Sequence, residues 1–254
     1  MNMMDPEKAG GAAPPARMTV LVLGATGRTG RLLLRRLLEE GAEVRAPVRS
    51  ASRLPRDLVG HPRLAVIEVD LTSLPDEALR DLARGCGAVV SCLGHTISLR
   101  GVFGPPRNLV TRTVARLCDA IKALGPAQPV RFALMSSVSV NAPGGVDARR
   151  GAFEKARLWV IRALVPPAAD NQRAADFLRT RIAADDPGLQ WVVVRPDTLV
   201  EGAGGDYALH EGIVSSLAKP DRTAMANVAS FLARLALEPR SWEEWKGRMP
   251  VIVG

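Results

Sequence analysis

The stretch Gly24-Ala25-Thr26-Gly27-Arg28-Thr29-Gly30 decides the fold of this chain. It directly follows the apolar run MTVLVL at 18–23, which is typical of a strand buried on both faces. It also opens the segment 28–40, whose leucines indicate a helix that ends at Gly41. A glycine-rich turn between a buried strand and a helix is the context in which this pattern indicates dinucleotide binding.

The glycines of this turn have separate expected roles. Gly24 permits the tight turn, Gly27 lets the backbone approach a pyrophosphate, and Gly30 lets the helix pack close to the strand. The helix N-terminus adds free N–H groups and a partial positive charge. The alternative is a turn with a purely structural role. We predict a cofactor site here that includes Gly24, Thr26, Gly27, Arg28, Thr29 and Gly30.

Strand and helix patterns alternate along the rest of the chain. Further strands are expected at 43–48, 64–69, 87–93, 129–135 and 191–194, with an edge strand at 251–253. Helices are expected at 75–84, 106–124, 152–164, 168–184 and 224–237, with a short last helix near Ser241. This alternation predicts an α/β fold, a Rossmann-type doubly wound parallel sheet with helices on both faces. Ligands then bind outside the carboxyl ends of the strands.

One domain is expected to account for most of the length. Residues 1–17 form a Gly/Pro/Ala-rich tail that we expect to be disordered. Residues 18–254 are expected to form a single NAD(P)-binding Rossmann domain with a small, loop-rich C-terminal substrate region. That region would be built from insertions at about 196–222 and 238–254. Residues 141–151 are interpreted as a mobile loop.

Composition excludes several classes of protein. The chain is 47% hydrophobic and 24% charged, which is typical of a globular protein and not of a disordered one. No apolar run approaches the ~18–20 residues of a membrane span, and the first 17 residues lack the apolar core of a signal peptide. Cys86, Cys92 and Cys118 fit no zinc spacing, so we expect no metal site. We interpret them as reduced, mostly buried thiols of a cytoplasmic protein.

The formal net charge of +8 suggests anionic partners. Eight arginines lie between Arg28 and Arg56, at positions 28, 31, 35, 36, 45, 49, 53 and 56. Three interpretations are open for them: a solvated basic face, a site for a phosphorylated ligand, or a nucleic-acid surface. No zinc-finger, homeodomain or RRM signature supports the last interpretation, so we expect no nucleic-acid partner.

The end of the second strand favours NADP(H) over NAD(H) as the cofactor. NAD sites usually place an Asp or Glu at this position to hold the ribose 2′-hydroxyl. Here the strand ends Ala46-Pro47-Val48-Arg49-Ser50, with Arg53 following and no acid. Arg49 can form a bidentate, charge-assisted pair with a 2′-phosphate, and Arg28 can reach the same group. The alternative is that Arg49 is a solvated surface residue.

Positions after the third and fourth strands complete the predicted cofactor site. Asp70 and Leu71 follow the third strand, where an adenine would lie and a carboxylate can accept the adenine amino proton. Leu93 and Gly94, followed by His95, are placed to flank the ribose. The alternative role for Asp70 is a helix cap.

The motifs together carry a resemblance to a known family. They are GATGRTG, VRSASRLP (48–55), VIEVDLT (66–72), AVVSCLG (88–94), FALMSSVSV (132–140) and WVVVRPDTL (191–199). Over roughly residues 18–240 the chain resembles the atypical branch of the short-chain dehydrogenase/reductase superfamily. Within that branch it is most similar to NmrA-like NAD(P)-binding proteins and to the biliverdin-IXβ reductase/flavin reductase group. The resemblance implies the Rossmann fold and a nicotinamide cofactor, and says less about the substrate.

The superfamily's usual catalytic set is a Ser, a Tyr and a Lys four residues after the Tyr. Ser137 matches the serine, with Ser136 beside it, whereas Ala168 and Gln172 stand at the Tyr and Lys positions. A Tyr whose pKa is lowered by a Lys is the acid that protonates a carbonyl, so its absence argues against ordinary alcohol and ketone chemistry. The flavin-reductase-like group works without this pair. The resemblance to that group is therefore consistent with a flavin or a conjugated molecule as the acceptor.

Other side chains are candidates for the missing proton donor. Asp170 begins the helix that normally faces the nicotinamide, although an N-cap role is the alternative. Tyr207, the only tyrosine, lies in the segment that usually closes over the substrate in this superfamily. We expect Arg195 to form an ion pair that fixes the 196–200 turn. The predicted catalytic residues are Ser137, Tyr207 and Asp170, with Ser136 and Pro196 at the nicotinamide end of the cofactor site.

Three functions are open from the sequence. The first is an NADPH-dependent reductase that transfers a hydride to a flavin-like or conjugated small molecule. The second is a non-catalytic, NmrA-like NADP(H)-binding redox sensor whose partner is another protein. The third is a lyase, isomerase or cyclase that holds the cofactor structurally. We expect a small-molecule substrate and no membrane partner. The composition does not indicate an oligomeric state.

Overall fold

The computed structural model describes residues 17–94, 108–147, 151–216 and 219–254, and its centre is an eight-stranded sheet. Along the sheet the strands follow the order β3-β2-β1-β4-β5-β6-β10-β8. They are β1 (Thr19–Leu23), β2 (Glu43–Val48), β3 (Leu64–Glu68), β4 (Ala88–Ser91), β5 (Val130–Met135), β6 (Leu189–Pro196), β8 (Ala208–His210) and β10 (Val251–Val253). Every neighbouring pair is parallel except β10 and β8. The predicted Rossmann-type doubly wound sheet is confirmed.

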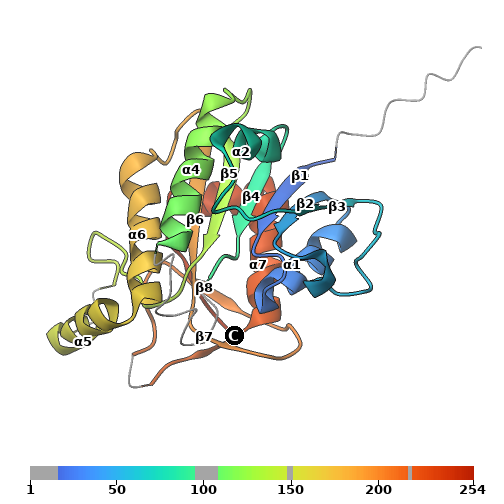
Figure 1. Cartoon of the computed structure of the whole chain (residues 1–254). Helices are drawn as coiled ribbons and strands as arrows, with labels where there is room; N and C mark the ends of the chain where they lie inside the picture. Colours follow the sequence, from blue (N-terminus) through green and yellow to red (C-terminus); the bar gives the residue numbers. More distant parts are fainter. Residues whose placement is uncertain (1–16, 95–107, 148–150, 217–218) are drawn as a thin grey trace, which may run out of the picture.

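Helices cover both faces of this sheet (Figure 1). One layer contains α1 (Arg28–Glu39), α7 (Met225–Leu237) and α8 (Pro239–Trp245). The other contains α2 (Asp76–Ala83), α4 (Leu109–Ala123) and α6 (Pro166–Arg181), with α5 (Ala152–Leu164) packed on α6. A short 3-10 helix, η1 (Ala51–Arg53), follows β2, and β7 (Thr198–Val200) pairs with β9 (Arg222–Ala224) in a small parallel sheet.

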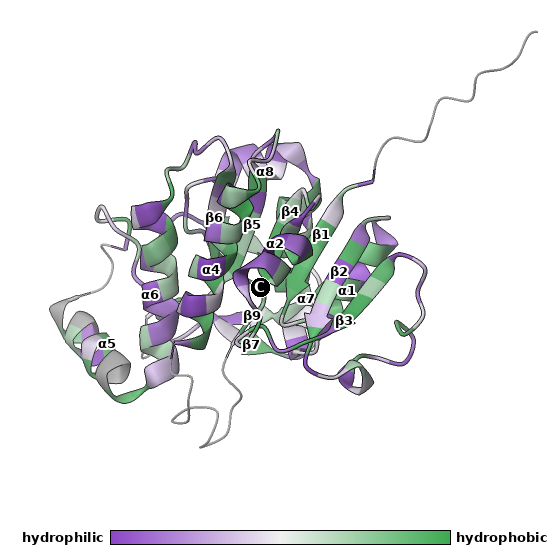
Figure 2. Ribbon diagram, turned by 45° about the horizontal axis from the view of Figure 1, so that its top comes forward, coloured by the Kyte–Doolittle hydropathy of each residue, from purple (hydrophilic) through white to green (hydrophobic). Residues whose placement is uncertain are grey.

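Strand β1 explains why its sequence is apolar without a break. Val20 and Val22 join the core cluster on the α1 and α7 side, whereas Leu21 and Leu23 join the cluster on the α4 and α6 side. Alternate side chains of a strand point to opposite faces, and here both faces are buried. Figure 2 shows the same pattern as a hydrophobic sheet between helices whose outer sides are hydrophilic.

The main error in the predicted fold concerns the last strand. β10 was expected at the edge, but it pairs with β6 on one side, with Val251 opposite Arg195, and with β8 on the other, with Val251 opposite His210. The edge strand is β8, three residues inside a glycine-rich segment with no alternating pattern. Its pairing depends on tertiary contact with β10, which a local pattern does not contain.

Two other expectations concern loops. The predicted disordered tail lies almost wholly outside the described residues, which begin at Arg17. Of the loop predicted to be mobile, residues 148–150 lie outside the described part, while Asp147 is buried and bonded to neighbouring segments. Within the described ranges, none of the helices combines the length and the apolar character that crossing a bilayer requires.

Candidate nucleotide-binding site

The β1–α1 turn is packed so closely that two of its positions accept only glycine. Gly24 has a φ of +74°, and a Cβ there would lie 2.5 Å from the carbonyl oxygen of Cys92, the residue that directly follows β4. A Cβ at Gly30 would lie 2.2 Å from the carbonyl oxygen of Gly24. The N–H of Gly27 donates to that same oxygen across 2.9 Å, which closes the turn. The sequence therefore folds here into a compact turn that ends at the start of α1.

The first turn of α1 presents an unsatisfied N-terminus to the cleft. Gly27 is the N-cap residue and supplies no side-chain hydrogen bond, and no acidic residue lies in the first turn. The first N–H groups of a helix have no intrahelical partner and carry the positive end of the helix dipole. The start of α1 can therefore accommodate a phosphate, which would accept hydrogen bonds from these backbone N–H groups.

A cleft of about 490 Å³ opens beside this helix end. It is lined by Thr26, Gly27, Arg28, Thr29, Gly30, Arg31, Arg49, Arg53, Cys92, Gly94, Met135, Leu199 and Met225. Eight of these are predicted cofactor residues, and they come together from the turn, the end of β2 and the end of β4. Arg31, Cys92, Met135, Leu199 and Met225 were missed. Arg31 directly follows the glycine motif, and that position was the available signal; its Nε donates to the carbonyl of Thr26 across 3.0 Å.

One end of the cleft is cationic and the other is apolar. Four arginine side chains line it, at positions 28, 31, 49 and 53. Among the described residues, the acid that forms an ion pair with one of them is Glu201, whose Oε1 lies 4.0 Å from Nη1 of Arg28, both side chains being exposed. The Glu68 carboxylate at the end of β3 accepts the N–H of Ala51 across 2.9 Å and so braces η1 without lining the cleft.

Several predicted cofactor residues do not line the cleft. Asp70 is exposed, and its Oδ1 accepts the N–H and the hydroxyl of Thr72 across 2.9 and 2.7 Å. These hydrogen bonds hold the pKa of Asp70 below its usual value, with the guanidinium of Arg49 adding to the effect. The helix-cap alternative is wrong, because the N-cap of α2 is Pro75 and carries no side-chain bond. The others that do not line it are Gly24, Leu71, Leu93, Ser136 and Pro196, while His95 lies outside the described residues.

Two serines follow β5 next to the cleft residue Met135. Ser136 is buried, and among the described residues its Oγ finds no hydrogen-bond partner. A buried hydroxyl without a partner is destabilising, so a polar ligand group reaching it would be favoured. Ser137 Oγ lies 2.6 Å from the Oγ of Ser139 and accepts the N–H of that residue across 3.2 Å. Neither serine lines the cleft, but both follow Met135, which does.

Asp170 is not placed to donate a proton to a ligand. It is completely buried, and its Oδ2 accepts the N–H of Val110 across 2.8 Å. Its Oδ1 accepts the N–H of Thr111 across 3.1 Å and the Thr111 hydroxyl across 2.6 Å. The prediction of a catalytic Asp170 is therefore wrong, because the carboxylate caps α4 from the neighbouring helix α6. The N-cap alternative had the right chemistry but assigned it to the wrong helix.

Tyr207 also lies away from the cleft. Its hydroxyl accepts a hydrogen bond from Nη1 of Arg234 across 2.9 Å, and its ring packs 6.2 Å from that of Phe231. Met225, at the start of α7, lines the cleft, and Arg234 is nine residues further along the same helix, roughly 13 Å away. The structure corrects the prediction that Tyr207 faces the substrate, because the half-buried ring packs against the core beside α7.

Arg195 forms the expected ion pair, but its partner lies in the 140–147 segment and not in the turn at 196–200. Its Nη1 lies 2.7 Å from Oδ2 of Asp147 in the preceding loop, and its Nε donates to the carbonyl of Met249 across 2.7 Å. Oε1 of Gln172 accepts the N–H of Asn141 across 2.9 Å. Both side chains anchor the 140–147 segment, which leads away from the two serines.

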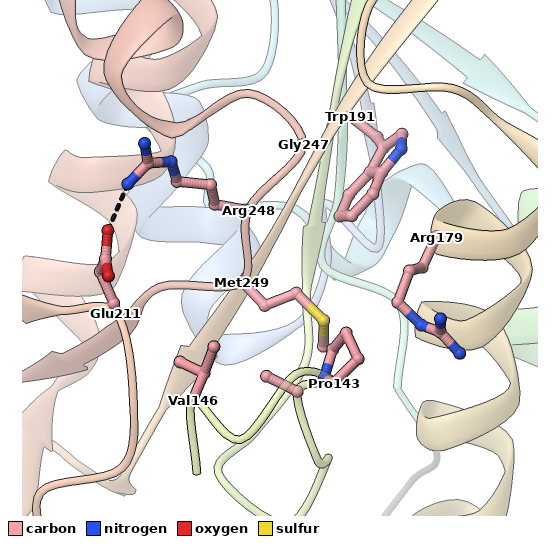
Figure 3. A pocket seen from close by; sticks show the side chains of 9 residues that line it. Pro143, Val146, Arg179, Trp191, Glu211, Gly247, Arg248 and Met249 are labelled. Atoms are coloured by element: carbon pink, nitrogen blue, oxygen red, sulfur yellow. Dashed lines mark hydrogen bonds and ion pairs between the residues drawn. The ribbon is translucent and has the colours of Figure 1, made fainter.

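A second pocket, of about 340 Å³, lies beside α6 (Figure 3). Trp191, Met249 and Pro143 point into it, and Arg179 lies across from an Arg248–Glu211 ion pair. Its wall includes Trp191 near the amino end of β6, whereas ligands of parallel α/β sheets bind at the carboxyl ends. The cleft at the glycine turn is therefore the candidate site.

Comparison with known proteins gives a consistent result. A family model described as NAD(P)H-binding matches residues 24–239. An uncharacterized chloroplastic protein of Arabidopsis thaliana is 26% identical over 231 residues, covering 89% of this chain and 80% of its own. A chloroplastic divinyl chlorophyllide a 8-vinyl-reductase of Zea mays is 31% identical over 76% of this chain, and one of Oryza sativa subsp. indica is 28% identical over 80%. This chain spans only 43% and 47% of the length of those two reductases.

Solved structures share the fold at low sequence identity. A short-chain dehydrogenase/reductase of Veillonella parvula in complex with NADP has a TM-score of 0.67 at 14% identity, covering 94% of this chain and 95% of that one. An anaerobillin reductase of Escherichia coli O157:H7 has a TM-score of 0.65 at 18% identity, covering 93% and 97%. The expectation of a cytoplasmic protein is wrong, because all three curated relatives above are named as chloroplastic proteins.

Proposed function

Because the chain belongs to the NAD(P)H-binding family, as its resemblance to atypical short-chain dehydrogenases/reductases indicated, we propose that it is an NADPH-dependent reductase of a conjugated small molecule. Its oxidoreductase-like fold and its glycine turn support a nicotinamide cofactor. The choice of NADPH over NADH, the class of acceptor and the residues that hold them are the proposal. We also propose a plastid as its location, following the names of its relatives.

The observation that carries the proposal is the cationic end of the cleft. Arg28, Arg49 and Arg53 line the same cleft as the glycine turn, and no acidic residue is among its described lining residues. A carboxylate at the end of β2 is what selects the free 2′-hydroxyl of NAD. Arginine instead pairs with a 2′-phosphate through two parallel, charge-assisted hydrogen bonds. The cleft therefore favours the phosphorylated cofactor.

The other residues of the cleft fit the rest of the dinucleotide. The N–H groups at the start of α1 would hold the pyrophosphate, and Gly27 leaves room for it because no side chain covers the backbone there. The unpartnered Oγ of Ser136 would bond the nicotinamide carboxamide. Met135, Leu199 and Met225 would exclude water at that end. When bound, the cofactor supplies a hydride, and these residues orient it.

The acceptor class follows from the absence of a proton donor of the usual kind. By spacing, the resemblance assigns Ala168 and Gln172 to the Tyr and Lys positions of the superfamily, and the only tyrosine, Tyr207, is bonded to Arg234. A conjugated acceptor gains the hydride on carbon or nitrogen and takes one proton from water, so it does not need a Tyr–Lys pair. The relatives named for reducing a chlorophyllide vinyl group and anaerobillin support a tetrapyrrole-like or flavin-like acceptor.

A second candidate function is a non-catalytic NADP(H)-binding protein. The same Ala168 and Gln172 favour it, since they leave the cofactor site intact without a catalytic pair. A lyase, isomerase or cyclase that binds the cofactor without consuming it has no specific observation in its favour.

The test is a parallel calorimetric titration with NADPH and NADH at fixed salt, followed by addition of FMN or biliverdin. Oxidation of NADPH would be followed by the loss of its near-ultraviolet absorbance. Preferential binding of NADPH with acceptor-dependent oxidation is the expected result. Binding without oxidation by either acceptor favours the non-catalytic function. Equal or tighter binding of NADH contradicts the role of the arginines.

A further inference from the structure

Helix α5 carries an apolar surface that faces solvent. Four of the six large hydrophobic side chains that are exposed in the described part of the chain lie on this one helix: Phe153 (81% exposed), Trp159 (71%), Val160 (44%) and Leu164 (66%). Phe153, Val160 and Leu164 are spaced by seven and four residues, which places them on a single stripe. Trp159 lies about 100° around the helix from Val160, on one flank of that stripe. We call these four residues the α5 apolar face.

The helix is held on the molecule by its opposite side. Leu158 is 1% exposed, and α5 contacts α6. In both views α5 lies at an outer corner of the molecule, beyond α6 (Figures 1 and 2). A surface helix ordinarily turns its apolar stripe toward the core, so this orientation needs a partner outside the chain. A corner position allows a flat surface to reach the stripe without meeting the rest of the fold.

We propose that the α5 apolar face inserts into an anionic lipid surface. Phe and Trp beside aliphatic residues are the side chains that interfacial helices bury at the boundary between headgroups and acyl chains. Residues 152–164, which form α5, contain three Lys or Arg and one Glu, and the whole chain has a net charge of +8. Anionic lipids attract such a segment. We expected no membrane partner because the sequence has no spanning apolar run, but a helix that lies in the interface needs no such run.

Charge and area both argue against a second copy of the chain as the partner. Two copies joined through α5 would bring like-charged segments together, which is unfavourable. The four side chains expose on the order of 500 Å², because a large aromatic side chain presents about 150–250 Å². A stable protein interface needs about 800 Å² from each partner. Interfacial insertion has no such minimum, since it combines apolar burial with attraction to charged headgroups.

The test is flotation of the full chain with phosphatidylcholine vesicles and with vesicles that also contain phosphatidylglycerol. We expect binding to the anionic vesicles, weaker binding to the neutral ones, and loss of binding as salt rises. The variant F153S/W159S should lower the partition coefficient by roughly tenfold or more, because two interfacial aromatics are removed. The matched control is Val59→Ser, which removes an exposed apolar side chain (59% exposed) far along the chain from α5.

Thermal unfolding midpoints show whether the variants fold, and we expect them to match the parent because the changed side chains are exposed. Failure of the parent to float with anionic vesicles at low salt would overturn the proposal, as would equal binding by F153S/W159S. A concentration-dependent dimer that the double variant loses, without vesicle binding, would assign the face to self-association instead. The readout does not depend on a nucleotide, so the result stands apart from the proposed reductase activity.

Discussion

Arg195 and Asp147 form a buried ion pair between β6 and the loop after β5. Nη1 of Arg195 lies 2.7 Å from Oδ2 of Asp147, and their side chains are 0% and 7% exposed. The pair is fully bonded on both sides. Arg195 also donates to the carbonyls of Val140 and Met249, and the Asp147 carboxylate also accepts the N–H of Ala142. One ion pair thus fixes the loop that begins at the two serines beside the cleft.

We predict that Asp147→Asn destabilises the fold by about 3–5 kcal/mol, because removing one partner leaves the buried guanidinium without a counter-charge. The measurement is the free energy of unfolding in urea. Asp81→Asn is the matched control: it removes an exposed ion pair with Arg84, 3.0 Å long and more than 60% exposed on both sides. Such pairs contribute about 0–1 kcal/mol. Equal effects of the two substitutions would contradict the assignment.

Arg49→Ala tests the preference for NADPH. The variant should bind NADPH roughly 10- to 100-fold more weakly and NADH unchanged, because a charge-assisted contact to a phosphate contributes about 1.5–3 kcal/mol. Calorimetric titration with both nucleotides measures this. Arg56→Ala is the control, since Arg56 is exposed and does not line the cleft. A parallel loss of NADH affinity would show that Arg49 acts on the shared part of the dinucleotide.

Gly30→Ala tests the packing of the turn. The added Cβ would lie 2.2 Å from the carbonyl oxygen of Gly24, a backbone atom that cannot move without opening the turn. We expect a loss of about 1–3 kcal/mol in stability, from the range for overpacked positions, together with weaker nucleotide binding. Gly202→Ala is the comparison, because nothing lies within 4 Å of a Cβ there. If both variants keep parental stability and affinity, the close helix–strand approach has no role.

The features that could be predicted from the sequence are those that depend on neighbouring residues. The glycine turn, the leucine periodicity of α1 and the arginines after β2 are local patterns, and the structure brings them to one cleft. Leu199 and Met225 reach the same cleft only through the pairing of β7 with β9 and the packing of α7. That tertiary contact leaves no periodic signal in either segment.

The wrong predictions for Asp170 and Tyr207 have the same physical cause. Asp170 bonds Val110, which is 60 residues earlier, and Tyr207 bonds Arg234, which is 27 residues later. The sequence identifies each as a polar side chain near an expected site, but its partner decides whether it faces a ligand. The sequence likewise predicted the helix at 152–164. Which side of that helix faces solvent depends on which side packs against the rest of the fold.

The three cysteines are free and buried, as the sequence indicated. Burial raises the pKa of Cys92, in the cleft wall, to about 12, and it also raises the pKa values of Cys86 and Cys118. Only the thiolate is alkylated readily, so iodoacetamide should leave the folded protein unlabelled at pH 8 and label three sites in urea. Intact mass measures both states.

The same shift makes stability depend on pH on the alkaline side. A thiol whose pKa is raised by folding loses its proton first in the unfolded chain, so its contribution is fully present below about pH 8.5 and declines above it. For Cys92 the decline extends to about pH 12. The free energy of unfolding should therefore fall more steeply with pH in the parent than in Cys92→Ala between pH 9 and 11. The difference between the two slopes should correspond to roughly one proton released on unfolding. Identical slopes would mean that Cys92 titrates in the folded chain as it does in the unfolded one, and that its side chain is open to solvent from the cleft.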